Sequence, residues 1–331
     1  MRIYYYKILI TIQKNAKFIN IFMFSVVFPG QGSQIVGMAK EFYNNFNYVK
    51  DYFDLADELL KKKISKLIID GPKQELDQTE NTQPAIFLAS YSIFKALEKE
   101  TSFKVNNAKF FAGHSLGEYS ALCCAQSITF EQTINLLKYR GMSMQNAVPK
   151  GEGGMIAILG VEINKINIIL KENEDKFLCY IANDNSSGQT VLSGRIESIE
   201  KLAEELTSRN IRFVKLPVSA PFHCPLMSKA TEQMKQIILD TEFKDPKVDI
   251  VSNVTANPVN NSKEIKKLLI DQIENPVRWR ESIENIIKLG INNFIEIGPG
   301  KVLSGLIKRI DRNVKTNQVN SILDLKNSVN D

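Results

Sequence analysis

Residues 113–117 read Gly-His-Ser-Leu-Gly, and this pattern constrains the local fold more than any other stretch of the chain. The apolar run Phe110–Ala112 before it predicts a short buried strand, and the Ala- and Leu-rich stretch 118–126 after it predicts a helix. Gly-x-Ser-x-Gly between a strand and a helix is typical of a nucleophile elbow, a sharp turn in which glycines make room for the backbone. The pattern therefore predicts an α/β fold that exposes the Ser115 hydroxyl at a helix N-terminus.

The base that would activate this serine is restricted by the histidine count. A serine hydroxyl becomes a good nucleophile only when a neighbouring group takes its proton. The chain has two histidines, and His114 is adjacent to the serine on a turn where neighbouring side chains point apart. His223, within the stretch 220–225, is therefore the candidate base. From these residues alone a second interpretation stays open, in which Ser115 caps a helix and His223 is a core residue.

The charge distribution argues against a nucleic-acid-binding protein. The 331 residues carry a formal net charge of +5, but four basic and no acidic residues lie within residues 1–22, so the rest carries only +1. A nearly neutral body lacks the basic patch that nucleic acids require. We interpret residues 1–22 as a leader or an N-terminal extension, because their apolar run is too short to span a bilayer. No membrane association is expected.

The cysteines predict neither a metal site nor a disulfide framework. They lack the spacing of zinc ligands, and two of them are adjacent in a predicted helix. We expect reduced thiols at Cys123, Cys124, Cys179 and Cys224.

The order of predicted elements indicates two domains. Residues 151–216 read as β-α-β-β-α-β, the ferredoxin-like arrangement, with strands expected at 155–159, 177–183, 189–193 and 212–217. This segment would be an insertion in a large α/β-hydrolase-like domain with a parallel sheet, formed by residues 23–150 and 217–315. Residues 316–331 are expected to be a C-terminal tail. The Gly-rich loop after the strand near residue 28 lacks the spacing of a nucleotide-binding motif.

Five strings, in this order, carry a family resemblance: FPGQGSQ (28–34), GHSLGEYSA (113–121), PVSAPFHCPLM (217–227), NPVRW (275–279) and EIGPGKVL (296–303). Together they resemble the malonyl-CoA:acyl carrier protein transacylases of type II fatty-acid synthesis, over about residues 24–310. The resemblance implies transfer of a malonyl group from malonyl-CoA to the phosphopantetheine thiol of holo-acyl carrier protein. It also implies a malonyl-serine intermediate and no bound cofactor.

The resemblance implies a role for each matching residue. Ser115 would carry the malonyl ester and His223 would act as base and acid, with its ring oriented by the backbone carbonyl of Gln272. The backbone N–H groups of Gln31 and Leu116 would form the oxyanion hole. A guanidinium holds a carboxylate with two hydrogen bonds, so Arg140 would bind the malonyl carboxylate. The possible pocket residues are Phe222 and Asn183.

Several partner and location assignments follow from the same resemblance. An acidic carrier protein would need a basic contact, for which Lys308 and Arg309 are candidates, with a solvated helix face as the alternative. The family favours a monomer. The basic leader suggests a plastid-type organelle, with the cytoplasm as the alternative. Two other functions remain open: a serine hydrolase or thioesterase with the same Ser-His pair, and a protein that docks a carrier without catalysis.

Overall fold

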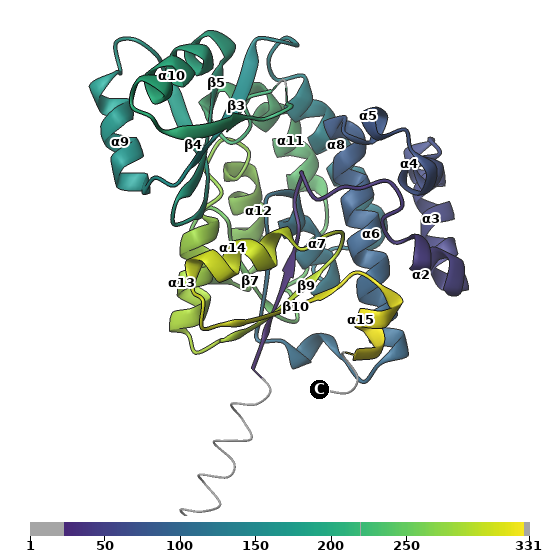
Figure 1. Cartoon of the computed structure of the whole chain (residues 1–331). Helices are drawn as coiled ribbons and strands as arrows, with labels where there is room; N and C mark the ends of the chain where they lie inside the picture. The colour runs from purple at the N-terminus through teal and green to yellow at the C-terminus, as the bar shows by residue number, and fades with distance from the viewer. Residues whose placement is uncertain (1–22, 219, 328–331) are drawn as a thin grey trace, which may run out of the picture.

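A six-stranded sheet forms the centre of the larger lobe in the computed structural model, which describes residues 23–218 and 220–327 (Figure 1). Its order is β10-β9-β1-β2-β7-β8, in which the first five strands are parallel and β8 is antiparallel to β7. The strands are β1 (Ser25–Phe28), β2 (Phe110–Gly113), β7 (Asp249–Val251), β8 (Pro258–Val259), β9 (Asn293–Ile297) and β10 (Lys315–Val319). The two Gly-rich loops leave the carboxyl ends of neighbouring strands, β1 and β2.

Helices cover both faces of this sheet. Val26 and Phe28 of β1 belong to one hydrophobic core and Val27 to the other, because successive side chains of a strand point to opposite faces. On the second face the core is completed by α13 (Trp279–Lys288) and α14 (Val302–Ile310). The helices of the first face are α2 (Lys40–Asn45), α3 (Asn47–Leu60), α4 (Ile64–Asp70), α5 (Lys73–Leu76), α6 (Thr79–Glu100), α7 (Leu116–Cys124), α8 (Phe130–Gln145), α11 (Ser228–Asp240), α12 (Ser262–Asp271) and α15 (Ile322–Asn327). Two short 3-10 turns are η1 (Val105–Asn107) and η2 (Pro225–Met227).

The small lobe has the predicted β-α-β-β-α-β order, and its antiparallel sheet runs β4-β5-β3-β6. A separate hydrophobic core lies between this sheet and its two helices. The elements are β3 (Gly153–Leu159), α9 (Ile163–Glu172), β4 (Cys179–Ser186), β5 (Gln189–Arg195), α10 (Ile196–Ser208) and β6 (Arg212–Lys215). The α/β class and the small antiparallel subdomain are thus confirmed.

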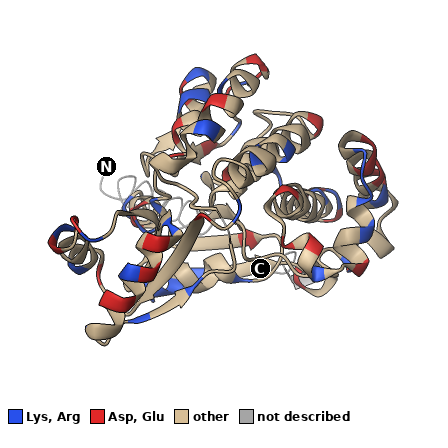
Figure 2. Cartoon of the chain, turned by 90° about the horizontal axis from the view of Figure 1, so that it is seen from above, with Lys and Arg blue, Asp and Glu red and all other residues tan. Residues whose placement is uncertain are grey.

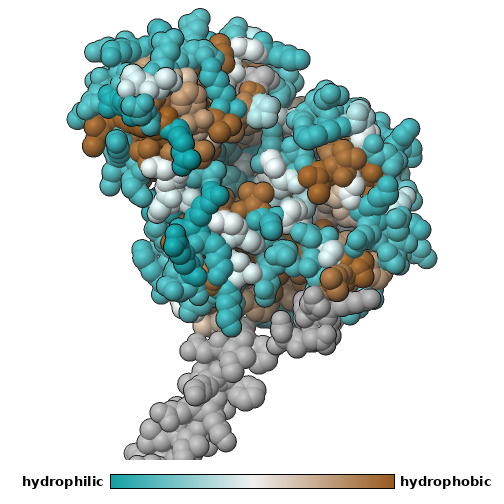
Figure 3. Space-filling view, in the orientation of Figure 1, coloured by the Kyte–Doolittle hydropathy of each residue, from teal (hydrophilic) through white to brown (hydrophobic). Residues whose placement is uncertain are grey.

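Strand β4 connects the small lobe to the large one. The N–H of Asp184 donates to the carbonyl of Val277 at 2.9 Å, and the N–H of Val277 donates to the carbonyl of Ala182 at 2.8 Å. The Asp184 carboxylate also receives hydrogen bonds from Arg280 of α13 at 2.8–3.2 Å. The lobes remain distinct in outline, with a notch between them in the space-filling view (Figure 3).

Two expected boundaries differ from the structure. Residues 316–319, expected in the tail, belong to strand β10, which pairs with β9 at the edge of the sheet, and α15 follows it. The sequence Lys-Thr-Asn-Gln-Val hides this strand because its alternate side chains face solvent. Strand β4 extends three residues beyond the expected end at 183, past two irregularities in its pairing with β5. The leader expected at residues 1–22 lies outside the described residues, so it and the plastid-type location stay predictions.

Candidate active site

Ser115 lies on a strained turn between β2 and α7. Its backbone has φ 53° and ψ −110°, a conformation that costs roughly 1–3 kcal/mol for a residue with a side chain. The turn is possible because its flanking residues are glycines. A Cβ on Gly113 would lie 1.9 Å from the carbonyl carbon of Gly117, and a Cβ on Gly117 would lie 2.3 Å from the carbonyl oxygen of Phe28. The predicted elbow therefore forms against the end of β1.

The elbow brings Ser115 to His223, 108 residues away in sequence. The Ser115 Oγ lies 2.8 Å from His223 Nε2, and His223 Nδ1 lies 2.9 Å from the main-chain oxygen of Gln272. Because a carbonyl oxygen only accepts, Nδ1 carries the proton and Nε2 is free to accept from the serine. Ser115 makes no side-chain capping hydrogen bond to α7. This geometry favours a nucleophile and base over the helix-cap interpretation.

Burial keeps the imidazole of His223 uncharged. The residue is 4% exposed, and desolvation, with a smaller contribution from the positive charge of Arg140, lowers its pKa to about 3. An imidazole with so low a pKa is neutral at pH 7, which is the form that accepts a proton. His223, like Ser115, has a positive φ, of 58°.

Arg140 is a fully buried cation beside the serine. Only 1% of the residue is exposed, and its Nη2 lies 3.1 Å from Ser115 Oγ. Its other hydrogen bonds go to neutral amide oxygens, from Nη2 to Gln272 Oε1 and from Nη1 to Gln83 Oε1, both at 2.9 Å. No salt bridge to Arg140 occurs within the described residues. A buried positive charge whose hydrogen-bond partners here are neutral amide and hydroxyl oxygens is suited to an anionic ligand.

A hydrogen-bonded network lies beneath the elbow, and sequence reasoning missed its side chains. The Glu118 Oε2 accepts from Gln272 Nε2 at 2.7 Å and from the N–H of Asn253 at 3.1 Å. The Asn253 side chain joins the N–H of Ser115 at 2.8 Å to the carbonyl of Gly113 at 2.7 Å. Burial raises the pKa of Glu118 to about 7. Asn253 follows the carboxyl end of β7, a position at which polar residues of a parallel sheet gather, and this signal could have identified it.

The two N–H groups expected to form an oxyanion hole lie on adjoining loops. Gln31 follows β1 and Leu116 follows β2, and a Cβ on Gly30 would lie only 2.4 Å from the carbonyl oxygen of His114. Within residues 23–218 and 220–327, no acceptor receives a hydrogen bond from the main-chain N–H of either residue. Both donors are therefore available to a ligand.

The comparisons with known proteins agree with this geometry. The family model of the acyl transferase domain matches residues 25–327. The malonyl CoA-acyl carrier protein transacylase of Bacillus subtilis (strain 168) is 44% identical over 293 residues, which cover 88% of this chain and 91% of the relative. The acyl-carrier-protein S-malonyltransferase of Bartonella henselae superposes with a TM-score of 0.90 at 39% identity, covering 93% of this chain and 99% of that one. The chain belongs to the acyl transferase domain family.

A third relative was solved with its partner. It is a malonyl-transacylase in complex with its type II PKS acyl-carrier protein, and it is similar to this chain with a TM-score of 0.89 and 37% identity, covering 93% and 99% of the two chains. The family resemblance seen in the five sequence strings is thus confirmed over nearly the whole described chain.

Two further residues of this acyl transferase domain are predicted to line the pocket, Phe222 and Asn183. Phe222 is buried in the larger core at 7% exposure, and Asn183 is buried where β4 meets Val277. His114 does not reach the serine hydroxyl. Its Nε2 lies 2.8 Å from Asn185 Oδ1 of the small lobe, and its ring packs on Trp279 with centroids 5.7 Å apart.

The two basic residues expected to contact a carrier protein lie at the end of α14. The Lys308 ammonium donates to main-chain carbonyls that follow its own helix, and Arg309 Nη1 donates to Gln189 Oε1 of the small lobe at 2.9 Å. Both residues are exposed. Figure 2 shows lysines and arginines interspersed with acidic residues over the outer helices rather than in one basic face.

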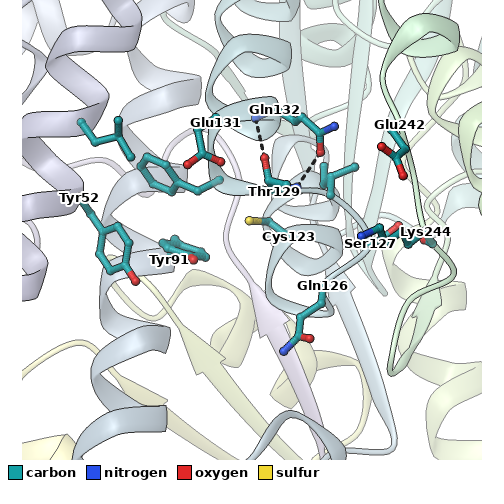
Figure 4. Close-up of a pocket in the computed structure, with 13 residues that line it drawn as sticks. Tyr52, Tyr91, Cys123, Gln126, Ser127, Thr129, Glu131, Gln132, Glu242 and Lys244 are labelled. Carbon is teal, nitrogen blue, oxygen red and sulfur yellow. Dashed lines mark hydrogen bonds between the residues drawn. The ribbon is translucent and has the colours of Figure 1, made fainter.

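A separate pocket of about 370 Å³ contains none of these residues (Figure 4). It lies between α3, α6 and the start of α8, with Tyr52 and Tyr91 on one side and the hydrogen-bonded pair Thr129 and Gln132 on the other. Within the described residues we find no helix long and apolar enough to cross a membrane and no cluster of three potential metal ligands.

Proposed function

We propose that this chain transfers the malonyl group of malonyl-CoA to the phosphopantetheine thiol of holo-acyl carrier protein, through a malonyl ester of Ser115. One observation carries the proposal. The Ser115 Oγ lies 2.8 Å from the neutral imidazole of His223 and 3.1 Å from the buried guanidinium of Arg140. The candidate nucleophile Ser115 Oγ is therefore in contact with both a base and a cation that can bind a carboxylate. The names of the relatives support the same reaction.

In the first half-reaction Ser115 Oγ attacks the thioester carbonyl of malonyl-CoA while its proton passes to His223 Nε2. The charge that develops on the carbonyl oxygen would be stabilised by the N–H groups of Gln31 and Leu116. The carbon–sulfur bond then breaks, and the imidazolium returns the proton to the CoA thiolate. Malonyl-Ser115 and CoA are the products of this step.

The second half-reaction runs the same chemistry toward a different thiol. His223 removes the proton of the phosphopantetheine thiol, and the thiolate attacks the ester carbonyl of malonyl-Ser115. The ester bond to Oγ breaks, and Oγ takes the proton from His223. The two halves share one site and one intermediate, so we expect ping-pong kinetics.

Arg140 gives the proposed reaction its acyl selectivity. The malonyl carboxylate loses its water on entering the site, and two hydrogen bonds from a guanidinium offset much of that loss. An acetyl group offers no such partner. Arg140 also distinguishes the proposal from a serine hydrolase or thioesterase, which has no need of a cation at this position. The intact Ser-His pair argues against a protein that docks a carrier without catalysis.

Intact-protein mass spectrometry tests the function directly. We expect brief exposure to malonyl-CoA to add one malonyl group to the protein, and holo-acyl carrier protein to remove it and gain the same mass. The Ser115→Ala variant should show no adduct and keep its circular dichroism spectrum. An adduct lost to water without transfer would indicate a hydrolase, and no adduct on the wild-type protein would leave carrier docking alone.

A further inference from the structure

We propose that the side chain of Gln272 is a positioning residue for acyl selectivity, because its carboxamide holds the Arg140 guanidinium beside the serine. The proposal rests on the function proposed above. The sequence resemblance assigns Gln272 only through its main-chain carbonyl, which orients His223. The structure gives its fully buried side chain a separate set of partners, which includes Arg140 and Glu118.

The partners of the carboxamide determine its orientation. Arginine only donates, so the atom that lies 2.9 Å from Arg140 Nη2 is the oxygen Oε1. The amide nitrogen then faces acceptors: Glu118 Oε2 at 2.7 Å and the main-chain oxygen of Ser115 at 3.2 Å. Because the Ser115 carbonyl accepts in any protonation state of Glu118, the amide has no favourable flipped arrangement.

This arrangement makes Gln272 a link between two parts of the reaction. Its main chain holds the imidazole that moves the proton, and its side chain holds the guanidinium that would receive the malonyl carboxylate. The amide oxygen is also neutral, which leaves the positive charge of Arg140 unpaired for the substrate. A carboxylate at position 272 would pair with Arg140 permanently and compete with malonyl. The identity of this side chain therefore affects which acyl group is selected, in addition to the stability of the site.

The test compares two acyl donors and one uncharged serine reagent. Gln272→Met keeps the approximate volume and the main-chain carbonyl but loses all four hydrogen bonds of the amide, one to Arg140 and three from its nitrogen to Glu118, Ser115 and Asn253. We expect the acylation kcat/KM with malonyl-CoA to fall about 100-fold, the loss that follows a displacement of a positioning group by about 1 Å. Acylation by acetyl-CoA should fall less than about 5-fold. Labelling of Ser115 by phenylmethylsulfonyl fluoride should keep its rate and its pH profile, since both report the unchanged Ser-His pair.

A second pair of variants separates selectivity from folding. Gln272→Glu alone places a carboxyl group against Glu118 and should destabilise the protein. Adding Glu118→Gln exchanges the amide and the carboxyl and should restore the melting temperature. In this double variant Arg140 faces a carboxylate, so malonyl-CoA acylation should stay low although the fold is recovered. Gln83→Met is a parallel test, because it removes the other amide from Arg140 and Gln83 has no hydrogen bond to Ser115 or His223. It should lower the malonyl preference without slowing the labelling of Ser115.

The experiments distinguish failure of the positioning role of Gln272 from failure of the proposed transfer function. Absence of a malonyl adduct on wild-type protein would overturn both. With wild-type acylation intact, an unchanged malonyl preference in Gln272→Met would overturn the positioning role. So would an equal loss for malonyl-CoA, acetyl-CoA and the sulfonyl fluoride, because that result indicates damage to the Ser-His pair. Full recovery of malonyl-CoA acylation in the exchanged double variant would also overturn the proposal, because a carboxylate beside Arg140 would then not compete with malonyl.

Discussion

The two lobes differ in what they give to the candidate site. The large lobe supplies the candidate reacting groups Ser115, His223 and Arg140 from three separate parts of its fold: the elbow, the segment before α11, and α8. Gln272 at the end of α12 makes hydrogen bonds to both His223 and Arg140. The small lobe contacts the flank of the site, where Asn185 meets His114. It is connected to the large lobe by polar links along β4. The difference teaches that the candidate chemical groups all belong to the lobe of the parallel sheet, while the smaller sheet packs against that lobe through apolar residues of the larger core as well as through the polar links of β4.

The largest effect on malonyl acylation is expected at Arg140, which belongs wholly to the large lobe. This prediction tests the division of roles between the two lobes. We expect Arg140→Ala to lower the acylation kcat/KM with malonyl-CoA by about 1,000-fold, the loss of a bidentate charged contact at a buried position. Arg140→Lys should recover only part of it, since an ammonium does not reproduce the planar fork. Single-turnover acylation followed by mass spectrometry measures both.

Acetyl-CoA is the internal control for this variant. Its acylation rate should change by less than about 10-fold, because acetyl has no carboxylate to lose. Equal losses for the two donors would mean that Arg140 supports the serine through its 3.1 Å contact with Oγ rather than selecting the acyl group.

Substitution at the attachment of the small lobe should lower the stability of the protein without changing its acyl selectivity, the reverse of the effect expected at Arg140. The side chain of Asp184 is 3% exposed and its partner Arg280 is 21% exposed and keeps a second partner, Glu284. Breaking a buried pair costs 3–5 kcal/mol, so we expect Asp184→Ala to lower the free energy of unfolding by about 2 kcal/mol after allowance for that exposure. Urea unfolding measures the loss, and hydrogen exchange should become faster in β4 and β5.

An exposed ion pair of the same lobe gives the matched control. Glu152 and Arg195 are 51% and 60% exposed, so Glu152→Ala should change the free energy of unfolding by less than about 1 kcal/mol. The ratio of malonyl to acetyl acylation should stay unchanged in both variants. A change in that ratio in Asp184→Ala would show that the small lobe takes part in acyl selection, and the division between the lobes would fail.

Sequence could predict the parts of this fold that are encoded locally. The elbow at 113–117, the strands next to it and the β-α-β-β-α-β insertion each have a pattern within a few tens of residues. The pairing of Ser115 with His223 followed from the scarcity of histidines. The role of the Gln272 carbonyl was implied by the resemblance, and the structure places it against the imidazole.

The network beneath the elbow could not be predicted in the same way. Glu118, Asn253 and the Gln272 side chain are ordinary polar residues in sequence, and their function depends on burial together at distances of 2.7–3.3 Å. Nothing local shows that a glutamate in the first turn of a helix faces an amide 154 residues away. Strand β10 was missed for a related reason, since an edge strand with one face in solvent has little apolar pattern to detect.

The smallest expected effect concerns carrier-protein docking at the seam between the lobes, by which we mean the surface where Arg309 of α14 meets Gln189 of the small lobe. Arg309 of α14 touches Gln189 of the small lobe, so a carrier bound beside Lys308 and Arg309 would contact both lobes. We expect Lys308→Glu with Arg309→Glu to lower kcat/KM for holo-acyl carrier protein about 3- to 10-fold at low salt, through slower association of opposite charges. The difference should shrink in high salt, because exposed charges are screened.

The two half-reactions supply the control for this last prediction. CoA is also an anion, so acylation by malonyl-CoA is measured in the same variant and should be unchanged if the basic pair serves the carrier alone. Lys40→Glu with Lys66→Glu reverses the same number of exposed charges on α2 and α4, away from α14, and should leave carrier kinetics unaltered (Figure 1). Equal losses for both substrates would place CoA phosphates at the seam, and unchanged carrier kinetics would remove docking from this surface and confine the role of Arg309 to its contact with Gln189.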